Sequence, residues 1–150
     1  MDNLRIQRAI LEDLDDLLPL FAGYRTFYQQ QPDADGEHRF LHDRLANHES
    51  VIFIARHGQQ AVGFAQLFAT FSSVHLQPAF ILEDLFVHAD ARKLGVAAAL
   101  LERAKLHARE WNAAGMFPET AHANRAAQRV YERAGWQLET QFRKYNCPLR

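Results

Sequence analysis

The clearest hydrophobic pattern of the chain lies between Phe80 and Trp111. Residues 80–87 are mostly Phe, Ile, Leu and Val and end at a turn cluster, which predicts a buried strand. From about Leu94 the apolar residues recur every three or four positions, which predicts a long amphipathic helix. Its expected inner face consists of Ala97, Leu100, Leu101, Ala104, Ala108 and Trp111. The stretch therefore reads as a strand, a tight loop and a helix.

The rest of the chain alternates between the periods of strands and helices. Strands are predicted at 4–9, 51–56, 61–71, 115–121 and 136–145, and helices at 12–30, 37–47 and 124–134. The strands at 51–56 and 61–71 form a hairpin, and Pro19 predicts a kink or a restart within the first helix. This order indicates a single domain, residues 1–150, of the α+β or α/β mixed class.

The loop between the central strand and the long helix carries candidate binding chemistry. Arg92 and Lys93 precede Gly95 at the point where the helix starts. A helix N-terminus has free N–H groups and a positive dipole end, which suit a phosphate, and small residues allow close approach to the backbone. An ordinary strand-to-helix turn that contains a glycine explains the same residues equally well. The loop has neither the P-loop pattern nor GxGxxG.

Two adjacent acids, Glu83 and Asp84, interrupt the apolar central strand. Burying a charge is costly unless it is paired, so the two acids suggest chemistry: binding of a cationic amine, or proton abstraction once burial raises the pKa. Strand alternation predicts opposite faces, with Glu83 beside Ile81 and Leu85, and Asp84 beside Leu82 and Phe86, unless a bulge intervenes. The alternative is a structural role, with the acid satisfied by Arg92, Lys93 or backbone N–H groups.

Composition narrows the class of protein. The formal net charge of -1 and a pI near 6.7 favour neither nucleic acid nor membranes as partners. No window approaches 18 apolar residues, and the first residues do not have the pattern of a signal peptide. The single Cys147 can form no internal disulfide, so we expect a cytoplasmic protein, and its position near the end favours a packing role over a nucleophile.

Histidines invite a metal interpretation, which the spacing does not favour. His38 and His42 are four residues apart and share one helix face. No third ligand follows at a suitable spacing, so we expect an exposed helix face and no metal site.

Two motifs resemble one family. Leu85-Phe86-Val87 followed by Arg92-x-x-Gly95-x-Ala97 is similar to the acetyl-CoA signature of the GNAT superfamily of acyl-CoA-dependent N-acetyltransferases. Downstream, Asn124-x-x-Ala127-x-x-x-Tyr131-x-x-x-Gly135-Trp136 resembles the second block of the family. The resemblance implies a central mixed, mostly antiparallel twisted sheet with helices on both faces and splayed central strands that hold acetyl-CoA.

The resemblance also implies a set of cofactor contacts. Backbone groups of Leu85, Phe86 and Val87 would pair with pantetheine, and the pyrophosphate would lie on the following loop. The residues implied for the cofactor are Leu85, Phe86, Val87, Arg92, Lys93, Leu94, Gly95, Val96, Ala97, Ala98, Asn124, Ala127 and Tyr131. Many members have glycine at the positions of Lys93 and Ala97, so the fine geometry of the loop differs here.

The implied reaction is direct transfer of an acetyl group from acetyl-CoA to a primary amine of a small molecule (polyamine-like, an amino acid or similar) or a basic peptide. Tyr131 matches the tyrosine that protonates or hydrogen-bonds the CoA sulfur, although such a tyrosine is more often a core residue. Glu83 is the first candidate for the base or amine ligand, and Asp84 the second. The acceptor would contact Tyr24, Phe27, Tyr28 and the segment from Phe71.

The sequence leaves two alternatives to an acetyltransferase. A non-catalytic acyl-CoA-binding regulatory or sensor module would keep the cofactor loop without turnover, and a nucleotide-binding domain unrelated to CoA would bind ATP or NAD. Family resemblance also allows a homodimer, with Trp136 and the last strand as the contact.

Overall fold

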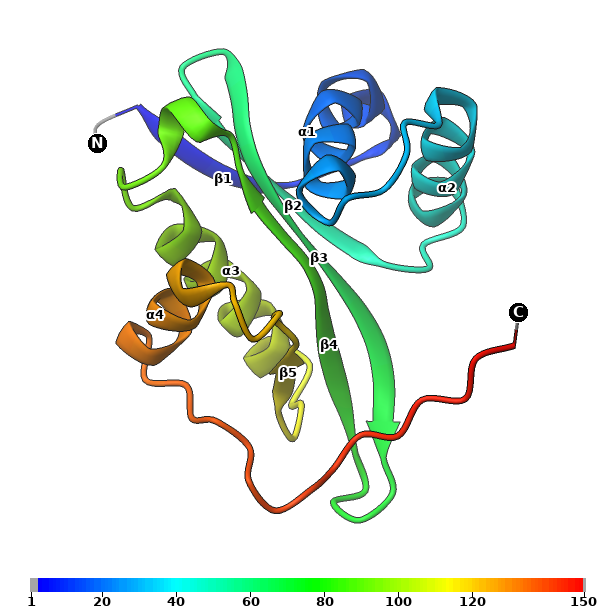
Figure 1. Ribbon diagram of the computed structural model, residues 1–150, viewed down its shortest axis with the longest axis vertical. Helices are drawn as coiled ribbons and strands as arrows, with labels where there is room; N and C mark the ends of the chain where they lie inside the picture. The colour runs from blue at the N-terminus through cyan, green and yellow to red at the C-terminus, as the bar shows by residue number, and fades with distance from the viewer. Residues whose placement is uncertain (1–2, 150) are drawn as a thin grey trace. The chain divides into compact units, whose positions relative to one another are not determined.

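The computed structural model describes residues 3–149, which divide into two compact units, one up to Glu119 and one from Thr120 onward. The first unit carries all of the sheet (Figure 1). Its elements are β1 Leu4–Arg8, η1 Leu11–Asp13, α1 Leu14–Phe27, α2 Ala34–Ala46, β2 Val51–His57, β3 Gln60–Ser72, β4 Gln77–Val87, η2 Ala89–Ala91, α3 Val96–Glu110 and β5 Met116–Pro118. The second contains α4 Arg125–Arg133. That the whole chain is one domain stays a prediction.

The sheet is mixed, as predicted, with the strands in the order β1-β2-β3-β4-β5. Each of the first four strands pairs antiparallel with the next strand in the sequence. The fifth strand, β5, pairs in parallel with β4 after the crossover through α3. β3 and β4 form the longest ladder and extend as a hairpin beyond the rest of the sheet (Figure 1).

Helices cover both faces of this sheet. α1 and α2 lie on one face, where Leu17, Phe21 and Leu41 pack against Ile54 and Phe64. α3 covers the opposite face and contacts β2, β3 and β4 through its buried stripe of Val96, Leu100, Leu101, Ala104, His107 and Ala108. The predicted inner face is correct at Leu100, Leu101, Ala104 and Ala108. It is wrong at both ends, because Val96 rather than Ala97 is buried at the start and Trp111 follows the last helical turn with 60% of its surface exposed; His107 was not predicted.

A β-bulge in β4 changes which face its residues occupy. Gln66 of β3 pairs with Asp84, but the next residue, Leu67, pairs with Leu82, so Glu83 has no counterpart. Residues paired across a ladder share a face, so Leu82 lies with Leu67 on the α3 face and Asp84 lies with Gln66 on the α1 face. The expected placement of Asp84 beside Leu82 is therefore wrong, because the extra residue reverses the alternation.

The start of α1 is held by charged groups from β2. The Asp13 carboxylate accepts the Ile10 N–H at 2.8 Å, and Arg56 binds Asp13 at 3.0 Å and Asp16 at 2.8 Å. The helix then continues through Pro19 without a restart, because the missing N–H removes only one helical hydrogen bond and buried residues on either side anchor the helix.

The second unit confirms the predicted helix but not the closing strand. Asn124 caps α4, its side chain accepting the Ala127 N–H at 3.1 Å. Residues 136–149 form no strand in the described chain, and Leu138, Phe142 and Tyr145 are each at least 77% exposed. A strand needs a neighbour to pair its peptide groups, and apolar spacing alone does not supply one.

Candidate active site

The edge of β4 is open where the bulge occurs. β4 pairs with β5 over Phe80, Ile81 and Leu82, and among the described residues no strand pairs with the later part of that edge. The His88 N–H donates to the Val62 oxygen of β3, and hydrogen-bonded pairs alternate along an antiparallel ladder. Leu85 and Val87 therefore turn their peptide groups to the open edge, while Phe86 turns its own toward β3.

This open edge lies within the first unit, beyond the three residues of β4 that pair with the short strand β5. Extended ligands bind such edges by pairing with free peptide groups, as an added strand does. Of the three residues predicted to pair with pantetheine, Leu85 offers its peptide groups and Val87 offers its N–H, because the Val87 oxygen accepts from Arg92 Nε. Phe86 supplies its ring to the α1 face, where it packs on the core.

The loop after β4 leads the chain into α3 with free N–H groups. Gly95 is the N-cap with φ 80°, a left-handed conformation that favours glycine. The first helical hydrogen bond is from the Ala99 N–H to the Gly95 oxygen at 3.1 Å. The N–H groups of Val96, Ala97 and Ala98 therefore precede the helical pattern, beside the positive end of the α3 dipole.

Arg92 joins this loop to the open edge. Its Nε donates to the Val87 oxygen at 3.0 Å, and its guanidinium lies 5.7 Å from the centre of the Phe86 ring. Lys93 follows with φ 66° and is exposed. A basic pair, free N–H groups and an open strand edge thus occur within a single stretch of β4, loop and α3, an arrangement suited to an extended ligand with phosphates.

Asp84 is the only described acid that is buried within the sheet, with 4% of its surface exposed. Its Oδ2 accepts a hydrogen bond from the Nε2 of Gln66, which is itself fully buried. Burial raises the pKa of Asp84 from 3.8 to about 6, against hydrogen bonds from Gln66 and Tyr24 that lower it, and the nearby Glu83 charge raises it further. A carboxyl group with this pKa can accept a proton near neutral pH.

Tyr24 of α1 ties the helix to the bulge. Its hydroxyl donates to the Glu83 backbone oxygen at 3.1 Å and lies close enough to Asp84 to favour the ionised carboxylate. Burial, followed by the charge of Asp84, raises the pKa of Tyr24 well above its usual value, so it remains a neutral donor. The Glu83 side chain, in contrast, is exposed.

The structure brings together only part of the predicted acceptor residues. Tyr24 contacts Tyr28, whose ring centre is 5.0 Å away, and Phe27 stacks edge-on against Tyr28 at 5.3 Å. Phe71 lies five residues beyond Gln66 on β3, about 17 Å along the strand, and is 80% exposed. The structure therefore places Tyr24 beside the buried acid, with Tyr28 packed on Tyr24 and Phe27 on Tyr28, and Phe71 farther along the sheet.

A partly buried ion pair anchors the segment between α1 and α2. Arg25 Nη1 donates to the Gln31 oxygen at 3.0 Å and binds Glu37 Oε2 at 2.6 Å, and the Glu37 side chain is 8% exposed. The contact closes the connection that follows Phe27 and Tyr28, so it fixes the position of the aromatic end of α1.

Replacing Arg25 with methionine is expected to lower the free energy of unfolding by about 2 kcal/mol, because Glu37 is left buried without its cation. For a chain of this size that change corresponds to a fall in Tm of roughly 4–8 °C. Glu49→Gln, which removes the more exposed contact with Arg44, serves as control and should shift Tm by about 1 °C or less. Equal effects from the two substitutions would show that burial of Glu37 is unimportant.

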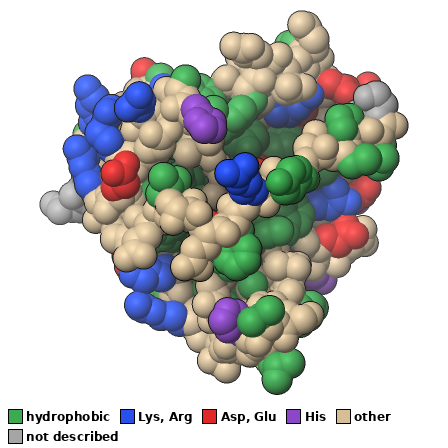
Figure 2. Space-filling view, turned by 60° about the horizontal axis from the view of Figure 1, so that its bottom comes forward, with side chains coloured by type: hydrophobic (Ala, Val, Ile, Leu, Met, Phe, Trp, Pro, Cys, Tyr) green, Lys and Arg blue, Asp and Glu red, His purple; other side chains and the backbone are tan. Residues whose placement is uncertain are grey.

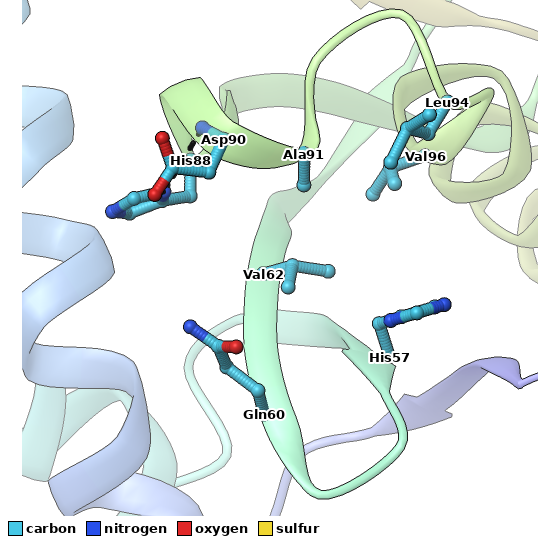
Figure 3. A pocket seen from close by; sticks show the side chains of 8 residues that line it. All are labelled: His57, Gln60, Val62, His88, Asp90, Ala91, Leu94 and Val96. Carbon is cyan, nitrogen blue, oxygen red and sulfur yellow. Dashed lines mark hydrogen bonds and ion pairs between the residues drawn. The ribbon is translucent and has the colours of Figure 1, made fainter.

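A small pocket lies beside the loop and the first turn of α3 (Figure 3). It has a volume of about 140 Å³, and His57 and Gln60 line one side while His88, Asp90 and Val96 line the other. Pockets for drug-sized ligands and cofactors are usually 300–1,000 Å³. The pocket is too small to enclose a whole cofactor, and its lining includes Leu94 and Val96 of the loop that leads into α3.

On the face seen in Figure 2, a group of Lys and Arg side chains lies at the upper left, and elsewhere basic and acidic side chains both occur among apolar and histidine side chains. Within residues 3–149, no helix is long and apolar enough to span a bilayer. In the same part of the chain, no three His, Cys, Asp or Glu side chains gather as a metal site would require.

The remaining predicted site residues belong to the second unit. Asn124 caps α4 by accepting a hydrogen bond from the Ala127 N–H. Tyr131 stacks on Trp136, with ring centres 5.6 Å apart. The catalytic role of Tyr131 and the dimer contact of Trp136 stay predictions.

Sequence reasoning missed two residues of the buried acid cluster. Ser50 Oγ donates to Gln66 Oε1 at 2.7 Å, and Gln66 in turn donates to Asp84. The signal was present, because Gln66 is the one amide in the otherwise apolar centre of its strand. Its partner could not be identified before the register of β3 and β4 was known.

The family follows from comparison with known proteins. The model of the Acetyltransferase (GNAT) family matches residues 14–136. An uncharacterised N-acetyltransferase of Bacillus subtilis strain 168, YhfO, is 42% identical over 149 residues, covering 98% of this chain and all of that protein. A probable acetyltransferase of Haemophilus influenzae is 36% identical over 103 residues, covering 68% of this chain and 70% of that protein. A crystal structure of a probable acetyltransferase superposes with a TM-score of 0.92 and 40% identity, covering 97% of this chain and 98% of the other.

The chain therefore belongs to the GNAT acetyltransferase family. The resemblance seen in the two sequence motifs is confirmed, and so is the predicted class of fold.

Proposed function

We propose that this protein transfers the acetyl group of acetyl-CoA directly to a primary amine, with Asp84 as the general base. The observation that carries the proposal is the position of Asp84: a nearly buried carboxyl group with a pKa of about 6, at the bulge where the edge of β4 opens. The membership of the family supports acetyl transfer as the reaction class.

Acetyl-CoA would bind along the open edge of β4. Pantetheine amides would pair with the peptide groups of Leu85 and the N–H of Val87, whose oxygen is bound by Arg92. The pyrophosphate would bind the first turn of α3. Arg92 and Lys93 would neutralise the phosphates, and the dipole of α3 would add to the attraction. Small residues at Gly95 and Ala97 leave the backbone accessible.

The acceptor ammonium must lose one proton before its nitrogen can attack the thioester carbonyl. Asp84 would take that proton directly or through a water molecule, because its pKa leaves it ionised at neutral pH. This assignment reverses the order predicted from the sequence, in which Glu83 came first. Glu83 is exposed and would attract the cationic amine through its charge.

The acceptor we propose is a cationic amine that carries an apolar or aromatic portion. Asp84 and Glu83 supply negative charge, and Tyr24 and Tyr28 supply aromatic surface beside it. The nearby cation, Arg25, is bound to Glu37 and is not available to an anionic acceptor. A polyamine, an amino acid amide or a basic peptide fits this description, and attack by the amine nitrogen expels the CoA thiolate.

Ligand binding tests the cofactor assignment before any acceptor is known. We expect Tm to rise in acetyl-CoA or CoA and to stay constant in ATP or NAD at the same concentration. At 100 times the dissociation constant the gain is about 2.7 kcal/mol, or roughly 5–11 °C for a chain of this size. A shift with ATP or NAD alone would exclude the CoA assignment.

Tyr131 is the proposed acid that protonates or hydrogen-bonds the departing thiolate. Tyr131→Phe is expected to lower kcat about tenfold to a hundredfold and to leave the Kd of acetyl-CoA nearly unchanged, because the hydroxyl acts mainly in the transition state. Tyr145→Phe is the matched control, since Tyr145 belongs to the same unit and is 87% exposed. Wild-type kcat in Tyr131→Phe would remove this residue from the mechanism.

A further inference from the structure

Three of the buried polar residues of the protein form one connected chain through the sheet. Ser50, immediately before β2, donates from Oγ to Gln66 Oε1 at 2.7 Å. Gln66 donates from Nε2 to Asp84 Oδ2. Ser50, Gln66 and Asp84 are 8%, 0% and 4% exposed, so each of these groups is shielded from solvent. We call this set the Ser50–Gln66–Asp84 chain.

Packing does not explain why an amide occupies this position of β3. Gln66 lies opposite Ile52 of β2 on one side and Asp84 of β4 on the other, in a sheet face otherwise covered by the apolar residues of α1 and α2. A buried amide is costly unless both of its ends are hydrogen-bonded, and an aliphatic side chain would avoid that cost. Both ends are satisfied here, and the donor end is directed at a carboxylate.

The direction of the two hydrogen bonds determines how the amide is oriented. The hydroxyl of Ser50 gives its proton to Oε1, so the NH₂ group of Gln66 faces Asp84. The opposite orientation would set the amide oxygen against the carboxylate and would be stable only with Asp84 protonated. A serine hydroxyl can donate or accept, so the ionised carboxylate selects this orientation and Ser50 satisfies the Oε1 on the other side.

We propose that Gln66, supported at its Oε1 by Ser50, is a positioning residue that holds Oδ2 of Asp84 and leaves the second carboxylate oxygen to take the proton of the acceptor ammonium. The inference rests on the proposed function, because it assigns a purpose to the same base. It explains how a carboxylate with almost no solvent contact stays ionised: the amide donor supplies part of the solvation that burial removes.

Other groups around Asp84 also affect its pKa. Glu83 on β4 opposes ionisation through its charge, and Tyr24 on α1 favours it through its hydroxyl. β3 contributes the neutral amide of Gln66. Removing the amide of Gln66 should therefore raise the pKa of Asp84. The hydrogen bond that stabilises the ionised carboxylate is lost, while burial and the Glu83 charge, which both raise the pKa, persist.

The test is a carboxyl-carbon NMR titration of the full chain, with the Asp84 signal assigned from its loss in Asp84→Asn. In Gln66→Met, which keeps an unbranched side chain and removes the donor, we expect the midpoint of Asp84 to rise by about one pH unit. Ser50→Ala should raise it by less, and Ser50→Thr, which keeps the hydroxyl, should return it to the wild-type value. Leu67→Met is the matched control, because Leu67 is as deeply buried on the same strand but pairs with Leu82. In this variant the titration midpoint of Asp84 should equal that of the wild type.

The acid limb of kcat/KM with an active primary amine should move with the NMR midpoint in each variant. An unchanged Asp84 midpoint in Gln66→Met would overturn the proposal. Should Gln66→Met fail to fold, an Asp84 midpoint that is the same in Ser50→Ala and Ser50→Thr would overturn it instead. A midpoint that moves while the acid limb does not would show that Gln66 holds Asp84 but that Asp84 is not the base. Acetyl transfer retained at the wild-type rate in Asp84→Asn would instead reject the base assignment of the proposed function while the NMR result on Gln66 still stands.

Discussion

Asp84→Asn is expected to lower kcat by about a hundredfold to ten-thousandfold, the range that a positioned general base supplies. The substitution keeps the size and the hydrogen-bonding position of the side chain but removes its ability to take a proton. Binding of acetyl-CoA should persist, because Asp84 belongs to the α1 face rather than to the open edge of β4. Calorimetric titration of acetyl-CoA alongside initial rates separates these two effects.

The same substitution should stabilise the fold at neutral pH. Because the folded pKa of Asp84 is about 6 and its ordinary value 3.8, ionisation costs the folded state up to about 3 kcal/mol above pH 6. Between about pH 6 and pH 3.8 the folded state binds the proton that the unfolded state has lost, so this cost fades as the pH falls. The Tm advantage of Asp84→Asn over the wild type should thus be present at pH 7 and absent below about pH 4.

Glu83→Gln is the matched control for both effects. Glu83 is the neighbouring acid on the same bulge, and its exposed side chain bears no such burial cost. We expect a higher KM for a cationic acceptor with a smaller change in kcat. A large loss of kcat in Glu83→Gln together with an unimpaired Asp84→Asn would exchange the roles of the two acids.

Gly95→Val is expected to weaken acetyl-CoA binding at least tenfold. Gly95 has φ 80°, and a β-branched side chain in this conformation is strained, so the chain must change its path where α3 begins. Within residues 3–149, no atom outside the adjacent residues lies within 4 Å of the Cβ that a substitution would add, so the backbone rather than a steric clash decides the outcome. A displaced first turn would remove the N–H groups of Val96, Ala97 and Ala98 from the phosphates.

Gly95→Asn separates backbone conformation from side-chain size. Asparagine tolerates the left-handed region better than other non-glycine residues. The asparagine variant should therefore bind acetyl-CoA more tightly than the valine variant. Isothermal titration of CoA into the two variants measures the difference. Equal affinities for the valine variant and the wild type would contradict a phosphate site at the start of α3.

The parts of the fold that depend on local periodicity could be predicted from the sequence. The apolar stripe from Leu100 to Ala108 located α3, and the Asn124 cap located α4, because helical spacing and capping are local. The strand expected at 136–145 did not form in the described chain, because strand formation depends on a partner that the residues themselves do not specify.

The sequence predicts only those residues of the candidate site that a local pattern marks. Both acids and the basic loop could be identified in the sequence, because charges within an apolar strand and a glycine at a helix start are visible there. The preference between Glu83 and Asp84 could not, because it depends on the bulge opposite Gln66 and Leu67, a property of strand register. The same register brings Gln66 opposite Asp84, a contact that local periodicity does not predict.

Acetyl transfer itself is the most direct test of the account. The full chain would be incubated with acetyl-CoA and, in separate reactions, with spermidine, an amino acid amide and a lysine-containing peptide, and both thiol release and the mass of the product would be measured. We predict amine-dependent thiol release that matches the amount of N-acetylated product and is lost in Asp84→Asn. Binding of acetyl-CoA with no amine-dependent thiol release from any of these acceptors would contradict the enzyme assignment and would favour an acyl-CoA-binding sensor.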